Sequence, residues 1–143
     1  MGNNILDTQV KYIVALGNIA RRIEYDLVDK LCGQDLAFRE ALIMKLEVMR
    51  AELAGPNATP LERQLVERVV LCWLTVHEAE YRFNQARDLS IKQADYWQRR
   101  ITACSRRYLF AVKTLATVRN LAIPVNVGQV NIGRKQVNVM NAI

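Results

Sequence analysis

The chain has 143 residues, 51% of them apolar, and a formal net charge of +6 at pH 7. This length suits a single domain with one core. Its longest uncharged apolar run, residues 69–77, is less than half of the roughly 20 residues that a membrane-spanning helix needs. Residues 1–7 lack the basic start and apolar segment of a secretory signal. We therefore expect a cytoplasmic protein with no membrane partner.

The basic residues are concentrated in the last third of the chain. Residues 1–89 hold 11 Lys and Arg against 13 Asp and Glu, whereas residues 90–143 hold 9 against the single Asp95. The first part therefore carries a net charge of −2 and the second part a net charge of +8. An asymmetry of this size indicates that the last third meets a polyanion or an acidic partner.

The first segment with a helical repeat runs from Ile5 to Leu31, where apolar residues recur every three to four positions. Gly17 lies inside this segment and costs about 1 kcal/mol relative to alanine, so a kink or a close helix contact is expected there. Gly33 is placed to end the helix.

Asp35 is placed to cap a second helix. The apolar repeat of this helix predicts a buried stripe made of Leu36, Phe38, Ala41, Leu42, Leu46, Met49 and Leu53. The charged residues of the same segment are expected to form a solvated face; they are Arg39, Glu40, Lys45, Glu47, Arg50 and Glu52.

The strongest local signal begins the third helix. After a break at residues 55–58, Thr59 is placed as the cap, Pro60 at the first helical position and Glu62 three residues after the cap. The helix is expected to end near Arg87. Its residues 69–76 read Val-Val-Leu-Cys-Trp-Leu-Thr-Val, with no charge and no turn former. A helix that is apolar on every side must be surrounded, so we expect this stretch at the centre of the fold.

Residues 88–90 form a predicted turn, and Ser90 with Gln93 matches a second capping box. The fourth helix then runs to about Leu121, because Pro124 prevents its continuation. Two long helices with a short joint indicate an antiparallel hairpin. The predicted fold class is mainly α: a four-helix bundle-like body over residues 1–121 that contains this long antiparallel helical hairpin, followed by a short β tail over residues 122–143.

The apolar repeat of the tail changes to about 2 residues, and glycines separate three copies of a triplet that places Asn between β-branched residues. The last two copies are able to pair as a hairpin around residues 133–135. Strands this short bury too little to be stable alone, so they either lie on the helical body or pair with strands of other subunits. We favour pairing between subunits. The predicted oligomerisation residues are Val125, Val127, Val130, Ile132, Val137 and Val139.

One face of the fourth helix is basic. Its cations fall within roughly 140° of the helix surface, with aromatic rings between them. Guanidinium groups bind phosphates and rings stack on bases, so this pattern predicts a surface that follows a nucleic-acid backbone. The candidate nucleic-acid-binding residues are Lys92, Tyr96, Arg99, Arg100, Arg106, Arg107, Phe110 and Lys113, together with Arg134 and Lys135 of the tail. The opposite side of the helix predicts a core stripe of Trp97, Ile101, Cys104, Tyr108, Val112 and Leu115.

Two other interpretations of the basic face stay open. In the first, its cations face acidic residues of the first helix, of a neighbouring subunit or of a protein partner, with Tyr96 and Phe110 packed against the same surface. In the second, the cations are solvated and have no partner.

The sequence shows no constellation typical of catalysis or metal binding. His77 is the only histidine, and the thiol and carboxylates near it on the helix do not converge with it on one point. Cys32, Cys72 and Cys104 are odd in number and widely spaced, which predicts buried free thiols. The glycines near the end of the chain are not followed by a helix, so they do not match a phosphate-binding loop. We therefore predict no catalytic residue, no metal and no cofactor.

Three parts of the chain carry a resemblance. They are residues 53–68 (Leu-Ala-Gly-Pro-Asn-Ala-Thr-Pro-Leu-Glu-Arg-Gln-Leu-Val-Glu-Arg), Tyr-Trp-Gln-Arg-Arg at 96–100 with Arg-Arg-Tyr-Leu at 106–109, and Gln-Val-Asn-Ile and Gln-Val-Asn-Val at 129–132 and 136–139. Over most of its length the chain resembles an uncharacterised bacterial family of small helical proteins associated with mobile elements. This resemblance implies a partner encoded nearby, but no activity.

A looser architectural similarity is to phage small terminase subunits, which join a helical oligomerisation core to a C-terminal β barrel in a ring. The helix-turn-helix module of that pattern is not evident in the N-terminal part of this sequence.

The sequence thus predicts a non-enzymatic, homo-oligomeric accessory protein that binds DNA or RNA through its fourth helix and assembles through its tail. The alternative is a scaffold or adaptor that binds an acidic protein partner and no nucleic acid. A third possibility is an enzyme subunit that another chain completes.

Overall fold

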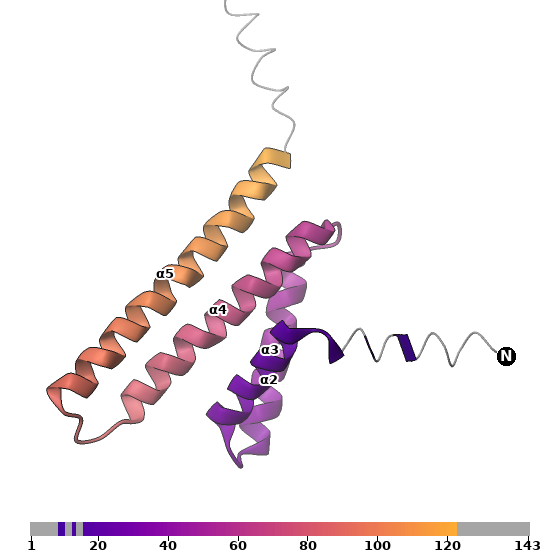
Figure 1. Cartoon of the computed structure of the whole chain (residues 1–143). Helices are drawn as coiled ribbons and strands as arrows, with labels where there is room; N and C mark the ends of the chain where they lie inside the picture. The colour runs from indigo at the N-terminus through magenta and orange to yellow at the C-terminus, as the bar shows by residue number, and fades with distance from the viewer. Residues whose placement is uncertain (1–8, 11–12, 14–15, 123–143) are drawn as a thin grey trace, which may run out of the picture.

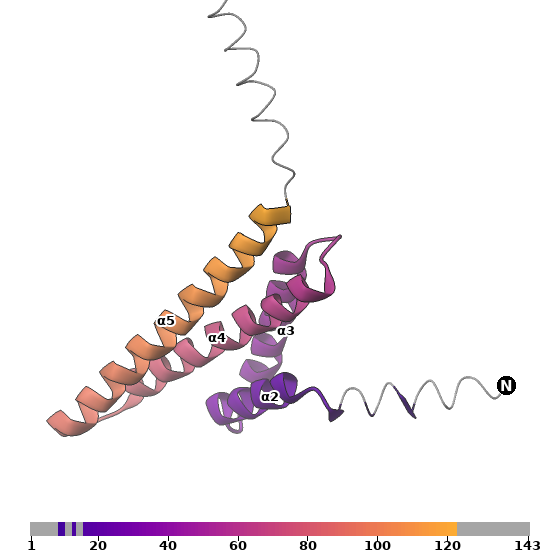
Figure 2. The ribbon, with the colours of Figure 1, turned by 45° about the horizontal axis from the view of Figure 1, so that its top comes forward.

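The computed structural model describes residues 9–10, 13 and 16–122 (Figure 1). This part of the chain contains the helices α2 (Ile19–Cys32), α3 (Leu36–Ala54), α4 (Pro60–Gln85) and α5 (Ile91–Ala122). The helices α4 and α5 lie side by side as a long antiparallel hairpin, and α2 and α3 pack on α4 and on each other (Figures 1 and 2). The mainly helical body with its hairpin is confirmed, while the predicted β tail lies outside the described residues.

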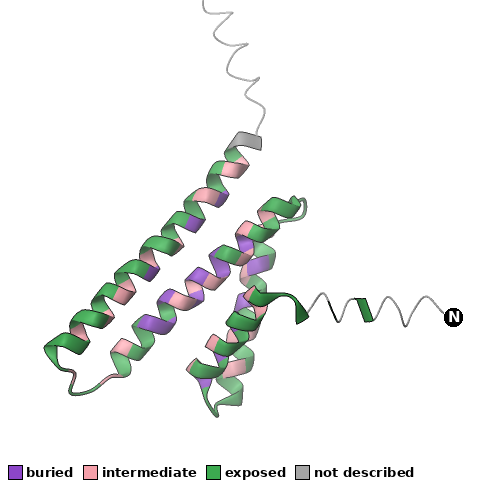
Figure 3. Cartoon of the chain, in the orientation of Figure 1, coloured by how far each residue is buried: buried purple, intermediate pink, exposed green. Residues whose placement is uncertain are grey.

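The centre of the arrangement is α4. It packs against each of the other three helices, whereas α5 packs mainly on α4, so within the described residues the bundle is open on the α5 side. Within residues 69–76 no residue is exposed (Figure 3). The buried members of this stretch are Val69, Val70, Cys72, Leu74 and Val76. The prediction that this stretch is surrounded is confirmed.

Two capping boxes begin the hairpin helices where the sequence predicts them. The backbone N–H of Glu62 donates to Oγ1 of Thr59 at 3.2 Å, and the backbone N–H of Thr59 donates to Oε2 of Glu62 at 2.7 Å. Ser90 and Gln93 repeat this arrangement at 3.2 and 3.0 Å. Each box satisfies backbone donors that have no acceptor inside the helix, which determines where α4 and α5 begin.

The helical segment predicted for residues 5–31 is interrupted at Gly17, the position where a kink or a close helix contact is expected. Leu16 is helical, the chain turns at Gly17, and Asn18 begins α2 by accepting a hydrogen bond from the backbone N–H of Arg21 at 3.1 Å. Glycine disfavours a helix interior and asparagine is a strong N-cap residue. At these two positions the local chemistry therefore outweighs the apolar repeat, which continues through them.

The turn between α2 and α3 matches its prediction. Gly33 has a φ of +54°, in the left-handed region that favours glycine, and it ends α2. The carboxylate of Asp35 accepts a hydrogen bond from the backbone N–H of Phe38 at 2.9 Å and so caps α3.

The predicted buried stripe of α3 is only partly correct. Leu36 is 72% exposed, Phe38 is 37% exposed and Ala41 is exposed. The apolar repeat continues into the first turns of α3, but that end of the helix is only partly covered: the centroid of the Phe38 ring lies 6.4 Å from the centroid of the Tyr81 ring on α4. Further along, the stripe is confirmed, because the next four members are buried or half-buried: Leu42, Leu46, Met49 and Leu53.

Arg50, which the sequence places on a solvated face, is instead buried, and that prediction is wrong. Its Nε lies 2.9 Å from both carboxylate oxygens of Glu67 on α4, its Nη1 lies 3.1 Å from Glu47, and its Nη2 pairs with buried Glu24 on α2. Arg21 adds a second guanidinium group, 3.6 Å from Glu67 and 3.7 Å from Glu24. Carboxylates from three helices thus compensate the buried charge of Arg50.

The side of α5 that faces α4 follows its predicted core stripe except at one residue. Cys104 and Leu115 are buried, whereas Val112 is 38% exposed at the edge of the contact. The remaining members are half-buried: Trp97, Ile101 and Tyr108. Cys104 is one of three free thiols, all of them buried as predicted; the others are Cys32 and Cys72.

Near the end of α5, Arg119 ties this helix to the rest of the body. Its Nε lies 3.3 Å from Oε1 of Glu62, and its Nη2 donates to the backbone carbonyls of Leu53 and Ala54, the latter at 3.2 Å. Those carbonyls belong to the last turn of α3, where no backbone N–H of the helix is available to donate to them. One side chain therefore joins the end of α5 to the end of α3 and the start of α4.

Candidate nucleic-acid interface

Half of the α5 surface faces away from α4 and carries a row of cations. Lys92, Arg99, Arg106 and Lys113 are all exposed and follow one another at intervals of seven residues. We call these four residues the basic ridge. Residues seven apart stay on one side of a helix with a drift of about 20° per interval. At about 1.5 Å per residue the ridge spans roughly 32 Å.

The cations of the basic ridge have few acidic neighbours. Arg99 pairs with Asp95 one turn earlier on α5, and both side chains are largely exposed, at 80% and 52%. An exposed pair of this kind contributes about 0–1 kcal/mol, so a phosphate is able to compete for Arg99. Among the described residues, Lys92, Arg106 and Lys113 have no carboxylate within 4.0 Å. The basic ridge therefore keeps most of its positive charge even when the negative charge of Asp95 is counted.

Arg100 lies nearer to α4 than the ridge does and serves the helix contact. Its Nη2 lies 3.4 Å from Oε2 of buried Glu78, and its guanidinium carbon lies 5.9 Å from the centroid of the Trp97 ring. Glu78 also pairs with Arg82. Burial lowers the pKa of Arg100, but the Tyr96 hydroxyl and the Glu78 carboxylate raise it by more, so the net shift is upward. The Nε of Arg100 is buried and has no hydrogen-bond partner among the described residues.

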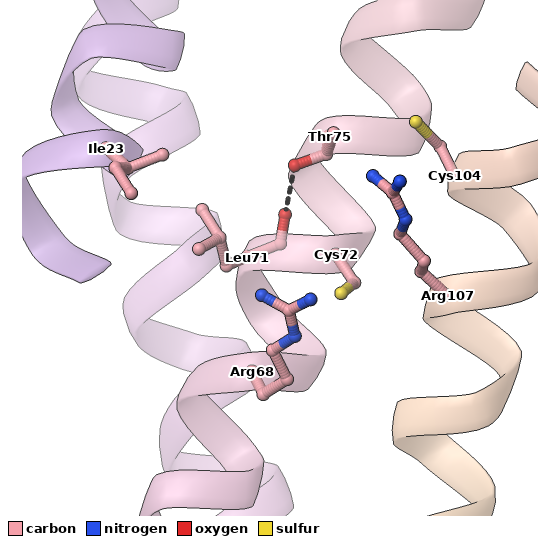
Figure 4. A pocket seen from close by; sticks show the side chains of 7 residues that line it. All are labelled: Ile23, Arg68, Leu71, Cys72, Thr75, Cys104 and Arg107. Carbon is pink, nitrogen blue, oxygen red and sulfur yellow. Dashed lines mark hydrogen bonds between the residues drawn. The ribbon is translucent and has the colours of Figure 1, made fainter. Parts of the chain in front are cut away.

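Two adjoining pockets lie along the seam between α4 and α5, on the Arg100 side. The larger, which we call the Tyr96 pocket, has a volume of about 370 Å³ and is lined by Tyr96, Arg99, Arg100 and Arg107 with smaller residues. The smaller, which we call the Arg68 pocket, has a volume of about 180 Å³ (Figure 4). Thr75, Cys104 and Arg107 line both pockets, and neither lining contains a carboxylate.

Arg68 is a residue that sequence reasoning missed. It lies on α4, is exposed, and lines the smaller pocket opposite Arg107 of α5 (Figure 4). Among the described residues, neither guanidinium has a carboxylate within 4.0 Å. The sequence offers no signal for Arg68, because its neighbourhood depends on the angle at which α5 crosses α4.

The two aromatic candidates are exposed. Phe110 is 72% exposed on the ridge side of α5, and Tyr96 is 58% exposed at the larger pocket. The Tyr96 ring meets the ring of Trp97 edge-on, with centroids 5.7 Å apart. An exposed aromatic ring of this kind is able to stack on a base.

Within the described part of the chain, the ion pairs of α5 reach Asp95 on the same helix and Glu78 and Glu62 on α4, and none reaches α2. The interpretation that the basic face meets acidic residues of the first helix is therefore wrong for residues 9–10, 13 and 16–32. The tail candidates Arg134 and Lys135, and the predicted oligomerisation residues from Val125 to Val139, lie outside the described residues.

Three further findings concern the described residues. No group of three or more His, Cys, Asp or Glu side chains among them is arranged to hold a metal ion. His77 is exposed, and its Nδ1 lies 3.0 Å from Oε2 of Glu80. Of the helices from α2 to α5, none combines the length and apolarity that crossing a membrane requires.

Comparison of the chain with protein-family models, with curated protein sequences and with solved structures gives no match. The resemblance to helical proteins associated with mobile elements and the similarity to small terminase subunits stay predictions from the sequence.

Proposed function

We propose that the protein is a non-enzymatic, cytoplasmic nucleic-acid-binding protein that contacts the phosphate backbone through the basic ridge of α5. The observation that supports this most is the exposure of Lys92, Arg106 and Lys113 without a carboxylate neighbour in the described part of the chain. Lys and Arg side chains on an open helix face are the groups that neutralise phosphates in nucleic-acid complexes.

The dimensions of the ridge agree with a nucleic-acid backbone. Its roughly 32 Å correspond to the axial rise of about nine base pairs of duplex DNA. Because α5 packs mainly on α4, its outer half is not covered by α2 or α3. A repeating anion can therefore contact all four cations at once, which favours a polyanion over a single small ligand.

Contact between two copies of the ridge is disfavoured, because like charges would face each other over its whole length. An acidic protein partner remains the second candidate, since it would neutralise the same cations. The exposed rings of Tyr96 and Phe110 favour nucleic acid, because every base offers a face on which such a ring can stack.

A direct comparison of two polyanions tests this function. Fluorescence anisotropy is measured for a labelled oligonucleotide and for a labelled polyglutamate peptide with the same number of negative charges. We expect tighter binding of the oligonucleotide, and a loss of that binding in Arg106→Gln/Lys113→Gln. Lys30→Gln/Lys45→Gln is the matched control, because both lysines are exposed and lie on α2 and α3. Equal or tighter binding of the peptide would favour the acidic protein partner.

Homo-oligomerisation through the tail is the second part of this proposal. Its support is the sequence of residues 122–143 alone, in which short alternating segments need partners to form a stable sheet. An assembly would place several basic ridges on one particle and raise affinity through multivalency.

A further inference from the structure

The two pockets beside the basic ridge point to a particular form of nucleic acid. We propose that they bind an unpaired nucleotide of a single strand, with its phosphate between Arg68 and Arg107 and its base against the ring of Tyr96. This inference rests on the proposed function and names the partner more narrowly: single-stranded nucleic acid in preference to duplex.

The Arg68 pocket is built to receive an anion. Arg68 on α4 and Arg107 on α5 line it from opposite helices (Figure 4). The hydroxyl of Thr75 donates to the backbone carbonyl of Leu71 at 2.7 Å, so its proton is already engaged. The remaining lining consists of thiols and apolar side chains, such as Cys72. The two guanidinium groups are thus the charged donors that this pocket offers to an anion.

The Tyr96 pocket continues this surface. It shares Thr75, Cys104 and Arg107 with the Arg68 pocket, so one ligand is able to reach both. The buried Nε of Arg100, which lacks an acceptor among the described residues, belongs to a residue that lines this pocket.

The position of the pockets favours a single strand. They lie where α4 packs against α5, beside the outer face of α5 that carries the ridge, and Arg99 is the ridge residue that also lines the Tyr96 pocket. A duplex keeps its bases stacked inside, so it contacts the ridge without entering the seam. An unpaired nucleotide is free to turn its base towards an aromatic ring while its phosphate meets a cation.

The test compares strand types with the full chain. Anisotropy is measured for a labelled mixed-sequence single strand and for the duplex of the same length and sequence. We expect the single strand to bind more tightly, and Arg68→Gln to weaken the single strand by about fivefold or more, with a smaller loss for the duplex. Arg63→Gln is the matched control, since it removes an exposed charge from α4 outside both pockets.

Tyr96 provides a second, independent variant. Tyr96→Leu should weaken single-strand binding roughly 5- to 150-fold, because it removes a ring on which a base can stack, and Tyr96→Phe should restore most of the affinity. Thermal melting of each variant checks that the fold is retained.

Several results would overturn this inference. One is equal weakening of duplex and single strand by Arg68→Gln. Another is displacement of the labelled strand by inorganic phosphate or a free mononucleotide at the same concentration as by unlabelled strand, which would show a small-anion site. Single-strand binding that depends on the ridge but not on Arg68 or Tyr96 would end this inference and leave the proposed function intact. The absence of binding to any nucleic acid would end both.

Discussion

Arg50 of α3 and Glu67 of α4 form a two-point ion pair, in which Nε of the arginine lies 2.9 Å from each carboxylate oxygen. The same guanidinium group also reaches Glu24 on α2 and Glu47 on α3. One buried cation therefore joins three helices on the side of α4 that is opposite to the nucleic-acid candidate α5. The hairpin presents its basic face while this cluster and the apolar core hold α2 and α3 in place.

Arg50→Ala should lower the free energy of unfolding by about 3–5 kcal/mol, because it leaves the buried carboxylate of Glu24 without its main partner. Urea denaturation followed by circular dichroism measures this loss. Lys45→Ala, an exposed cation on the same helix, is the control and should change stability by no more than about 0.5 kcal/mol. A loss below about 1 kcal/mol in Arg50→Ala would argue against the buried cluster.

Leu74→Ala should destabilise the protein by about 2–5 kcal/mol, because this residue is 1% exposed in the middle of α4 and truncation leaves a cavity. Leu61→Ala on the same helix is a matched control, since Leu61 is 55% exposed. Chemical denaturation gives the free energy of unfolding of both variants. Because both replace leucine by alanine in the same helix, the difference between their losses reports the burial of Leu74. Similar losses in the two variants would place residues 69–76 outside the core.

Glu62 should contribute a pH-dependent part of the stability. Hydrogen bonds from the backbone N–H and the hydroxyl of Thr59, and then the Arg119 guanidinium, hold the pKa of this carboxyl below its ordinary value of 4.5. A lowered pKa in the folded state gives stability that is present above pH 4.5 and is lost as the pH falls through the lower folded-state value.

Glu62→Gln keeps a side-chain acceptor for the capping box and removes the charge. We therefore expect a lower melting temperature than wild type at pH 7 and a smaller difference at acidic pH, where the wild-type carboxyl is protonated. Thermal melts at several pH values measure this difference. A constant difference across the range would show that the charge of Glu62 does not stabilise the fold.

Truncation after Pro124 tests the assembly prediction made from the sequence of the tail. If the tail strands pair between subunits, the truncated chain should have a lower oligomeric state and nearly unchanged helical circular dichroism, since the helical core lies within residues 16–122. Light scattering at several concentrations gives the mass of each particle. An unchanged oligomeric state would show that the tail is not an assembly element.

The elements that could be predicted from the sequence are those that depend on neighbouring residues. The start of α4 could be predicted from Thr59, Pro60 and Glu62, because a capping box needs only four consecutive residues. The uncharged run at 69–76 likewise predicts a surrounded helix without reference to its partners. The cations of the ridge share one face because their seven-residue spacing determines it.

Other features depend on how the helices cross, which the sequence does not show. Arg50 follows the alternating charges of a solvated face, yet three carboxylates from other turns and helices enclose it. Leu36 follows the apolar repeat, yet it is 72% exposed at the start of α3. Arg68 and Arg107 line one pocket because α4 packs on α5, so this site appears only in the structure.

The salt dependence of nucleic-acid binding tests the central claim most directly. If the basic ridge neutralises phosphates, the logarithm of the association constant should fall linearly with the logarithm of salt concentration, with a slope of about −0.9 per phosphate on duplex DNA and about −0.7 on a single strand. Arg106→Gln/Lys113→Gln should flatten this slope by about one to two units and weaken all sequences alike, because phosphate contacts carry no sequence information. Lys30→Gln/Lys45→Gln should keep the wild-type slope. Binding that is absent in the wild type, or that does not change with salt, would contradict the proposal that α5 contacts a nucleic-acid backbone.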